Sequence, residues 1–169
     1  VFLAGKYYGE MSVLTYEKEF LDEVWATIRT SLQKLTFEYD MLLVEGAGSP
    51  VEMNEKSEDI VNMAIAHEVD AAVILVADME RGGAFAAIVG TLALLNEVER
   101  ARVKGIVLNK FHGEKELFTD NVAWLENYIG IPVLGVIPYI SVQLEVEDSL
   151  SGKIGLGIQE NQNRQSREE

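Results

Sequence analysis

Four short apolar runs recur along the chain, each rich in Val, Ile, Leu or Ala, and none alternates strictly between apolar and polar positions. A continuous apolar run of this length is typical of a strand that is buried on both faces, as in a parallel sheet. The pattern therefore predicts four strands, at residues 41–45, 72–77, 105–109 and 133–137.

Helical periodicity separates the apolar runs. In the first helical segment the apolar side chains recur at spacings of three and four, which predicts a single apolar face. The third segment is apolar almost all round, which predicts a helix buried against the sheet. Acidic residues follow Thr15 and Ser57, as is favourable at helix N-termini. The predicted helices span residues 17–35, 57–67, 84–95 and 116–129.

The alternation of strands and helices predicts a three-layer α/β fold with a mainly parallel sheet. The strands begin about 30 residues apart, the spacing that βαβ units require. Residues 159–169 contain no apolar side chain and cannot bury enough surface to offset the entropy of ordering. We therefore expect one domain over residues 1–150, and a polar linker or disordered tail over residues 151–169.

Charge and composition exclude several classes of function. The net charge of −14 argues against a nucleic-acid binder and against docking on an anionic membrane. The chain contains no Cys, so it has neither a disulfide nor a thiolate nucleophile. No apolar run reaches the length of a membrane span. The first residue is Val rather than Met, and we expect the chain to be part of a longer protein.

Candidate chemistry lies at the carboxyl ends of the predicted strands, where open parallel sheets bind their ligands. The first strand ends in Glu45, followed by a turn that contains Gly46 and Gly48. A carboxylate in this position can hold Mg²⁺ or a metal-bound water, and the two glycines let a ligand approach the backbone. Alternatively, Glu45 caps the amides of the following loop.

The second strand ends in Asp78, and Arg81, Gly82 and Gly83 follow just before the buried helix. A guanidinium and exposed amides at a helix N-terminus suit a phosphate or a carboxylate. An ordinary strand-to-helix connection with a solvated Arg81 is the alternative.

The third strand ends in Asn109 and Lys110. An Asn side chain can donate to and accept from an adenine edge, although an Asn at a strand end is often structural. The two histidines, His67 and His112, lack metal-ligand spacing. A G-x-x-x-x-G-K-[ST] loop, the usual cradle for β- and γ-phosphates, is absent from these 169 residues.

Several motifs, in order, resemble the cobyric acid synthase family. They run over about residues 5–150 and comprise Glu45-Gly46-Ala47-Gly48-Ser49-Pro50, Glu52, Asn54, Asp59-Ile60-Val61-Asn62-Met63, Asp78-x-x-Arg81-Gly82-Gly83, Asn109-Lys110-Phe111 and Pro132-Val133-Leu134-Gly135-Val136-Ile137-Pro138-Tyr139. The resemblance implies a P-loop fold of the dethiobiotin synthetase type, here without its N-terminal strand and phosphate loop. The departures are Glu80 in place of Asp, His112 in place of Arg, and Glu114 in place of Asp.

The resemblance also implies a reaction and roles for residues. The family activates corrinoid side-chain carboxylates with ATP and Mg²⁺, and amidates them with ammonia from glutamine. Glu45 would then hold Mg²⁺, Asp78 and Arg81 would lie near the transferring phosphate or the corrinoid carboxylate, and Asn109 would face adenine. Gly46, Gly48, Gly82, Gly83 and Lys110 would line the nucleotide site, and Glu52, Asn54 and Asp59 the substrate side.

The resemblance implies a cytoplasmic ligase whose phosphate loop lies upstream and whose glutaminase domain lies downstream, so this chain alone is expected to be inactive. Two alternatives remain open. One is a related amidoligase, such as cobyrinate diamide synthase or dethiobiotin synthetase. The other is a non-catalytic domain that binds a nucleotide or a protein partner. Without its first strand, the sheet would have an unprotected edge that can recruit a partner strand or form a homodimer.

Overall fold

A computed structural model describes residues 1–10, 20–51, 61–114 and 118–141. Contacts divide the chain into two units, Val1–Tyr139 and Ile140–Glu169, and the description below concerns the first. The predicted linker over residues 151–169 lies outside the described residues, as do Glu52, Asn54 and Asp59, the three positions expected on the substrate side.

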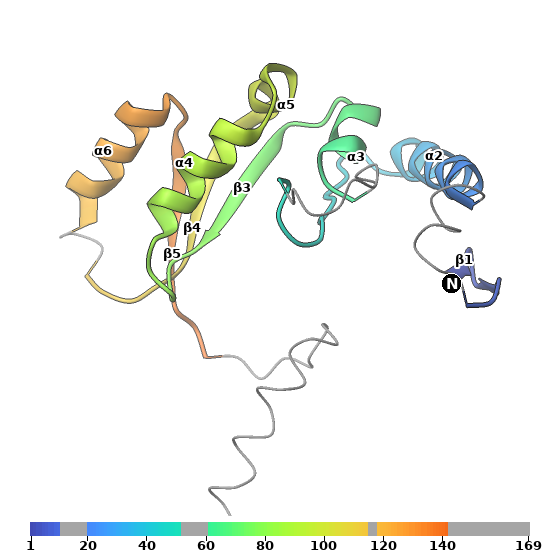
Figure 1. Ribbon diagram of the computed structural model, residues 1–169, viewed down its shortest axis with the longest axis horizontal. Coiled ribbons are helices and arrows are strands. Elements are labelled where there is room, and N and C mark those ends of the chain that lie inside the picture. The colour runs from blue at the N-terminus through green and yellow to red at the C-terminus, as the bar shows by residue number, and fades with distance from the viewer. Residues whose placement is uncertain (11–19, 52–60, 115–117, 142–169) are drawn as a thin grey trace, which may run out of the picture. The chain divides into compact units, whose positions relative to one another are not determined.

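The main sheet has three parallel strands in the order β3-β4-β5 (Figure 1). The strands are β3 (Val73–Asp78), β4 (Val103–Phe111) and β5 (Val133–Pro138). Three of the four predicted strands and the predicted parallel sheet are therefore confirmed. Register pairs Asp78, the last residue of β3, with Asn109, which lies two residues before the end of β4, so both residues lie at the same edge of the sheet.

Helices connect and flank these strands. The predicted helix that is apolar almost all round is α4, and it buries Ala84, Ile88 and Leu92 while Leu94 stays exposed. The helices are α2 (Leu21–Glu38), α3 (Met63–Glu68), α4 (Ala84–Leu94), α5 (Glu97–Arg102) and α6 (Thr119–Ile129).

The core lies between β4 and the helices α4 and α6. Its largest fully buried side chains are Ile88, Leu92, Ile106, Leu108 and Leu125. They belong to a single cluster that draws on both helices and on the central strand. Packing of these side chains holds α4 against the sheet and so fixes the turn that joins β3 to α4.

One helix and one hairpin were not predicted. Helix α5 begins at a capping box, in which the Asn96 side chain accepts from the Glu99 amide and the Glu99 carboxylate accepts from the Asn96 amide, both at 3.0 Å. The Asn-x-x-Glu spacing is a known N-terminal signal and could have revealed this helix. A short antiparallel hairpin pairs β1 (Phe2–Leu3) with β2 (Lys6–Tyr7).

The prediction of a strand over residues 41–45 is wrong, because this segment has no secondary structure. Met41 and Leu43 are 78% and 88% exposed. An extended segment becomes a strand only when a neighbour satisfies its backbone groups, and no described strand pairs with this one. The apolar run by itself does not say which segment would pair with it.

Candidate functional site

The candidate site forms where β3 and β4 end. Asp78 and Asn109 are register partners, and the Met79 amide donates to the Asn109 carbonyl at 2.8 Å. The sheet therefore places side by side two residues that are 31 positions apart in the sequence. Both were predicted as site residues, and this closeness agrees with the rule that parallel strands present their polar residues at one edge.

Asp78 and Lys110 form an ion pair at this edge. The Lys110 Nζ lies 2.7 Å from Asp78 Oδ2 and 3.6 Å from a Glu80 carboxylate oxygen. The second Asp78 oxygen, Oδ1, accepts from the Glu80 amide at 2.8 Å. Lys110 has a φ of 57°, a left-handed backbone conformation that is unusual for a residue other than glycine and is often found at functional sites.

These contacts shift the ionisation of both partners. The hydrogen bond from Lys110, followed by that from the Glu80 amide, lowers the pKa of Asp78. The hydrogen bond to Asp78 raises the pKa of Lys110. Both side chains are more than 40% exposed, so solvent screens their attraction and the pair adds little stability. Its main consequence is that a carboxylate and an ammonium stay charged and close together at the strand ends.

Replacing Lys110 with Met is expected to raise the pKa of Asp78 toward its ordinary value of about 3.9. A depressed carboxyl pKa contributes stability above the ordinary pKa, and that contribution is lost as the pH falls through the folded-state value. Carboxyl carbon NMR titration of Asp78 measures the shift. Lys104→Met is the matched control, because Lys104 donates to the backbone carbonyl of Ala101 and should leave Asp78 unchanged. An unchanged Asp78 titration in Lys110→Met would contradict the pairing.

The turn between β3 and α4 contains Arg81, Gly82 and Gly83. Gly82 and Gly83 have φ values of 74° and 70°, a conformation that costs glycine little. Gly83 is the N-cap of α4, and the cap makes no side-chain hydrogen bond. The first amides of α4 therefore lie next to a turn without β-carbons at two successive positions, and Arg81 is exposed beside them. This arrangement suits an anionic group, and the binding of one there stays a prediction.

The side chain of Asn109 has a local role that limits adenine recognition. Its oxygen accepts from the Lys110 amide at 2.9 Å. An Asn oxygen has two lone pairs, so it can accept from an adenine amino group only while sharing this hydrogen bond. The Asn109 side chain could contact a purine through its oxygen or through its NH₂ group. Because the oxygen already accepts a hydrogen bond, the NH₂ group is better suited.

An aromatic pair beside these residues was not predicted as part of a site. The rings of His112 and Tyr139 stack with centroids 4.6 Å apart and an interplanar angle of 24°. The Tyr139 amide donates to the Phe111 carbonyl at 2.9 Å, which brings the ends of β4 and β5 together. The only sequence signal was the position of each residue just beyond a strand, so their stacking became visible only in the fold.

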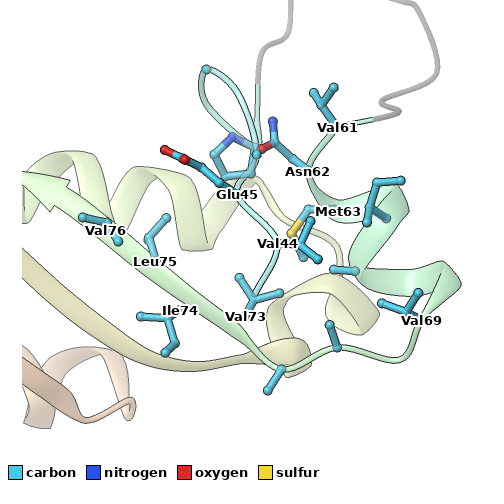
Figure 2. Close-up of a pocket in the computed structure, with 17 residues that line it drawn as sticks. Val44, Glu45, Val61, Asn62, Met63, Val69, Val73, Ile74, Leu75 and Val76 are labelled. Carbon is cyan, nitrogen blue, oxygen red and sulfur yellow. The ribbon is translucent and has the colours of Figure 1, made fainter. Parts of the chain in front are cut away.

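Glu45 lies in a different part of the structure, on a loop held by α3. The Asn62 side-chain nitrogen donates to the Ala47 carbonyl at 2.7 Å and to the Ser49 carbonyl at 3.4 Å. A β-carbon at Gly46 would collide with the Asn62 side chain, so this close approach requires glycine. The loop places Glu45 in the wall of a groove beside β3 (Figure 2).

Glu45 has the donor chemistry of a magnesium ligand. Mg²⁺ is usually held by one or two carboxylates together with waters and substrate phosphates, rather than by a cage of protein groups. Within the described parts of the chain, no group of three or more His, Cys, Asp or Glu side chains could hold a metal. A single exposed carboxylate fits the first pattern, with nucleotide oxygens as the remaining ligands.

The structure thus brings together some of the predicted residues. Asp78, Asn109 and Lys110 meet at the strand ends next to the turn formed by Arg81, Gly82 and Gly83. Glu45, Gly46 and Gly48 line the groove beside β3. The parts played by Glu52, Asn54 and Asp59 remain predictions.

The parallel sheet, the flanking helices and the polar strand ends define an α/β protein of the P-loop-like class. A family model described as an AAA domain matches residues 15–145, which is most of the chain, and the chain belongs to this family. Among curated proteins it is 50% identical over 151 residues to the cobyric acid synthase of Microcystis aeruginosa, covering 89% of this chain and 31% of that protein.

A further curated relative carries the same name. The cobyric acid synthase of Geobacillus thermodenitrificans is 45% identical over 152 residues, covering 89% of this chain and 30% of that protein. The chain therefore spans about a third of the length of the curated relatives it matches. No solved structure matches it. In the described part of the chain, no helix combines the length and the apolar character needed to cross a membrane.

Proposed function

We propose that this chain is part of an ATP-dependent amidoligase that converts corrinoid side-chain carboxylates to amides, as in cobyric acid formation. The observation that carries the proposal is the strand-end cluster of Asp78, Asn109 and Lys110 beside an anion-suited turn. It occurs in a chain that is 50% identical to a cobyric acid synthase. Ammonia would come from a glutaminase domain elsewhere in the polypeptide, and the reaction would take place in the cytoplasm.

The chemistry explains why such a cluster is needed. A carboxylate resists attack by ammonia until one of its oxygens becomes a good leaving group, and ATP supplies this by forming an acyl phosphate. Charge on the transferring phosphoryl group must then be neutralised. Arg81 and the first amides of α4, which follow Gly82 and Gly83, would bind phosphate or carboxylate oxygens, and Asn109 would position adenine. Glu45 would hold Mg²⁺, which stabilises phosphate charge when bound.

Lys110 and Asp78 have opposing effects on an incoming anion. The Lys110 ammonium attracts phosphate, but Asp78, 2.7 Å away, competes for the same donor hydrogens. An anionic ligand would therefore bind best where Lys110 contacts Asp78 and the ligand at once, since an ammonium has three donor hydrogens. Asp78 would thus position Lys110, in addition to any contact of its own with the substrate.

A chimera tests the function. The matched region of the Microcystis aeruginosa enzyme is replaced by this chain, and ADP formation is measured with a corrinoid carboxylate and an ammonia source. We expect ADP formation that depends on both additions. A chimera that folds but forms ADP independently of the corrinoid, or not at all while the parent enzyme is active, would contradict the proposal.

The alternative of a nucleotide-binding module without catalysis predicts a different result for the isolated chain. Because these residues contain no G-x-x-x-x-G-K-[ST] loop, we expect weak binding of Mg²⁺–ATP, or none, in isothermal titration calorimetry. A dissociation constant for Mg²⁺–ATP below about 1 μM would favour a nucleotide-binding module without catalysis. A related amidoligase would instead give a chimera that turns over a different carboxylate substrate.

A further inference from the structure

Three aromatic rings form a row that crosses from α4 to α6. Trp124 and Tyr128, one turn apart on α6, stack with centroids 5.2 Å apart and an interplanar angle of 12°. Phe85, in the first turn of α4, is parallel to Trp124 within 6°, with ring centroids 6.1 Å apart. Trp124 and Tyr128 are 55% and 63% exposed. The aromatic row of Phe85, Trp124 and Tyr128 therefore presents an apolar surface that the described part of the chain leaves uncovered.

The helix that carries the two exposed rings is fixed on its buried side. Leu125 and Ile129 are buried and belong to the core cluster. The Arg100 guanidinium donates to the Leu92 carbonyl at 3.1 Å and to the Ile129 carbonyl at 3.3 Å, which ties the carboxyl ends of α4 and α6 together. The exposed rings are therefore held in place without being needed to fill the core. Large exposed apolar side chains that lie together in this way mark an interaction site.

The aromatic row begins beside the turn that suits an anion. Phe85 lies four residues after Arg81 and two after Gly83, the N-cap of α4. The Phe118 ring lies 5.9 Å from that of Phe85 and 4.6 Å from that of Phe111, at the end of β4. Aromatic contacts thus continue without a break from the end of β4 to the exposed rings on α6.

Helix α6 offers an incoming ligand apolar surface and no positive charge. Its eleven residues include Asp120 and Glu126 and neither Lys nor Arg, and Asp120 is exposed one turn before Trp124. A negative group would be repelled there and attracted instead to Arg81 and the first amides of α4. The ligand that fits both regions is therefore a broad apolar ring body that carries a carboxylate at its edge.

We infer that the aromatic row binds the face of the substrate's corrin ring while one side-chain carboxylate lies at the turn formed by Arg81, Gly82 and Gly83; this inference rests on the proposed function. A corrin is a broad conjugated macrocycle with acetate and propionate side chains around its rim, so it has both parts of such a ligand. Aromatic side chains stabilise conjugated rings through dispersion and through burial of apolar area. The row would thus hold the ring so that a rim carboxylate reaches the transferring phosphoryl group.

Equilibrium dialysis of the chimera described above tests this contact without ATP. The probes are the dicyano forms of cobyrinic acid, whose side chains are free carboxylates, and of cobinamide, whose side chains are amides. Both are coloured and are measured by visible absorbance. We expect Trp124→Ala and Tyr128→Ala each to weaken the binding of both probes by about tenfold, as for the loss of one stacking ring. Arg81→Gln should weaken the binding of cobyrinic acid alone, since only its side chains carry charge.

Two further variants distinguish a lost contact from a lost fold. Trp124→Phe retains a ring and should bind both probes within about threefold of the parent chimera. Phe37→Ala removes a ring that is 93% exposed on α2, outside the aromatic row, and both probes should bind as before. Equal weakening by Phe37→Ala and Trp124→Ala would overturn the inference. So would unchanged binding in Trp124→Ala, or a parent chimera that binds neither probe.

ADP formation separates this inference from the proposed function. In an active chimera, Trp124→Ala should raise the KM for the corrinoid about tenfold and leave kcat and the KM for ATP within about twofold. An inactive chimera whose corrinoid binding depends on Trp124 would refute the function and support the aromatic row. An active chimera whose corrinoid KM is unchanged by Trp124→Ala would leave the function standing and overturn the inference.

Two other occupants of the aromatic row would show themselves in the same variants. A Trp124→Ala chimera in which only the KM for ATP rises would assign the rings to adenine. A Trp124→Ala chimera that loses a dimer in analytical ultracentrifugation, with unchanged corrinoid binding, would assign them to a second copy of the chain. Either result would overturn the inference.

Discussion

Replacing Glu45 with Gln in the chimera described above is expected to lower Mg²⁺-dependent ADP formation by at least about 100-fold, because a metal ion contributes several kcal/mol of charge stabilisation. The substitution keeps the size and hydrogen-bonding shape of the side chain and removes its charge. A neutral amide is a poor ligand for Mg²⁺ compared with a carboxylate. The variant therefore separates a metal-binding role from a role in capping the loop, the alternative that the sequence left open.

The experiment needs both a dose series and a control. Raising the Mg²⁺ concentration should restore part of the activity if Glu45 binds the ion, because weaker affinity is offset by mass action. Glu97→Gln is the control, since Glu97 is an exposed carboxylate in the first turn of α5 and should retain activity. Normal turnover by a folded Glu45→Gln chimera would refute the metal assignment. A loss that no Mg²⁺ concentration reverses would indicate a structural role in the loop.

Replacing Leu108 with Ala is expected to destabilise the isolated chain by about 2–5 kcal/mol. Leu108 is 0% exposed, lies on the central strand β4 and belongs to the core cluster shared with α4 and α6. Truncation removes buried apolar surface and leaves a cavity that the packed neighbours fill only in part. Because whole domains are stable by only about 5–15 kcal/mol, this loss is a large fraction of the total.

Urea denaturation followed by circular dichroism measures the effect as a lower transition midpoint. Leu134→Ala is the matched control, because Leu134 lies on the neighbouring strand but is largely exposed, and its loss should cost less than about 1 kcal/mol. Similar midpoints for the two variants would mean that the core is not centred on β4. A Leu108→Ala variant that shows no unfolding transition, because it is already unfolded without urea, would also agree with the expected loss of stability.

The sequence by itself determined the fold class and the polar residues that lie at the strand ends. Continuous apolar runs at residues 72–77, 105–109 and 133–137 predicted buried parallel strands, and β3, β4 and β5 lie there. A parallel sheet must present its carboxyl ends at one edge, so Asp78 and Asn109 could be expected near each other without a structure. The motifs around them pointed to the family that the comparisons bear out.

Only the tertiary structure decided the contacts across elements. The Asp78–Lys110 pair, the stacking of His112 on Tyr139 and the fit of Gly46 against Asn62 depend on how separate segments come together. Residues 41–45 show the physical reason most clearly. Their apolar pattern predicts a strand, but a strand exists only when a neighbour supplies hydrogen bonds, and the identity of that neighbour is a long-range property of the sheet.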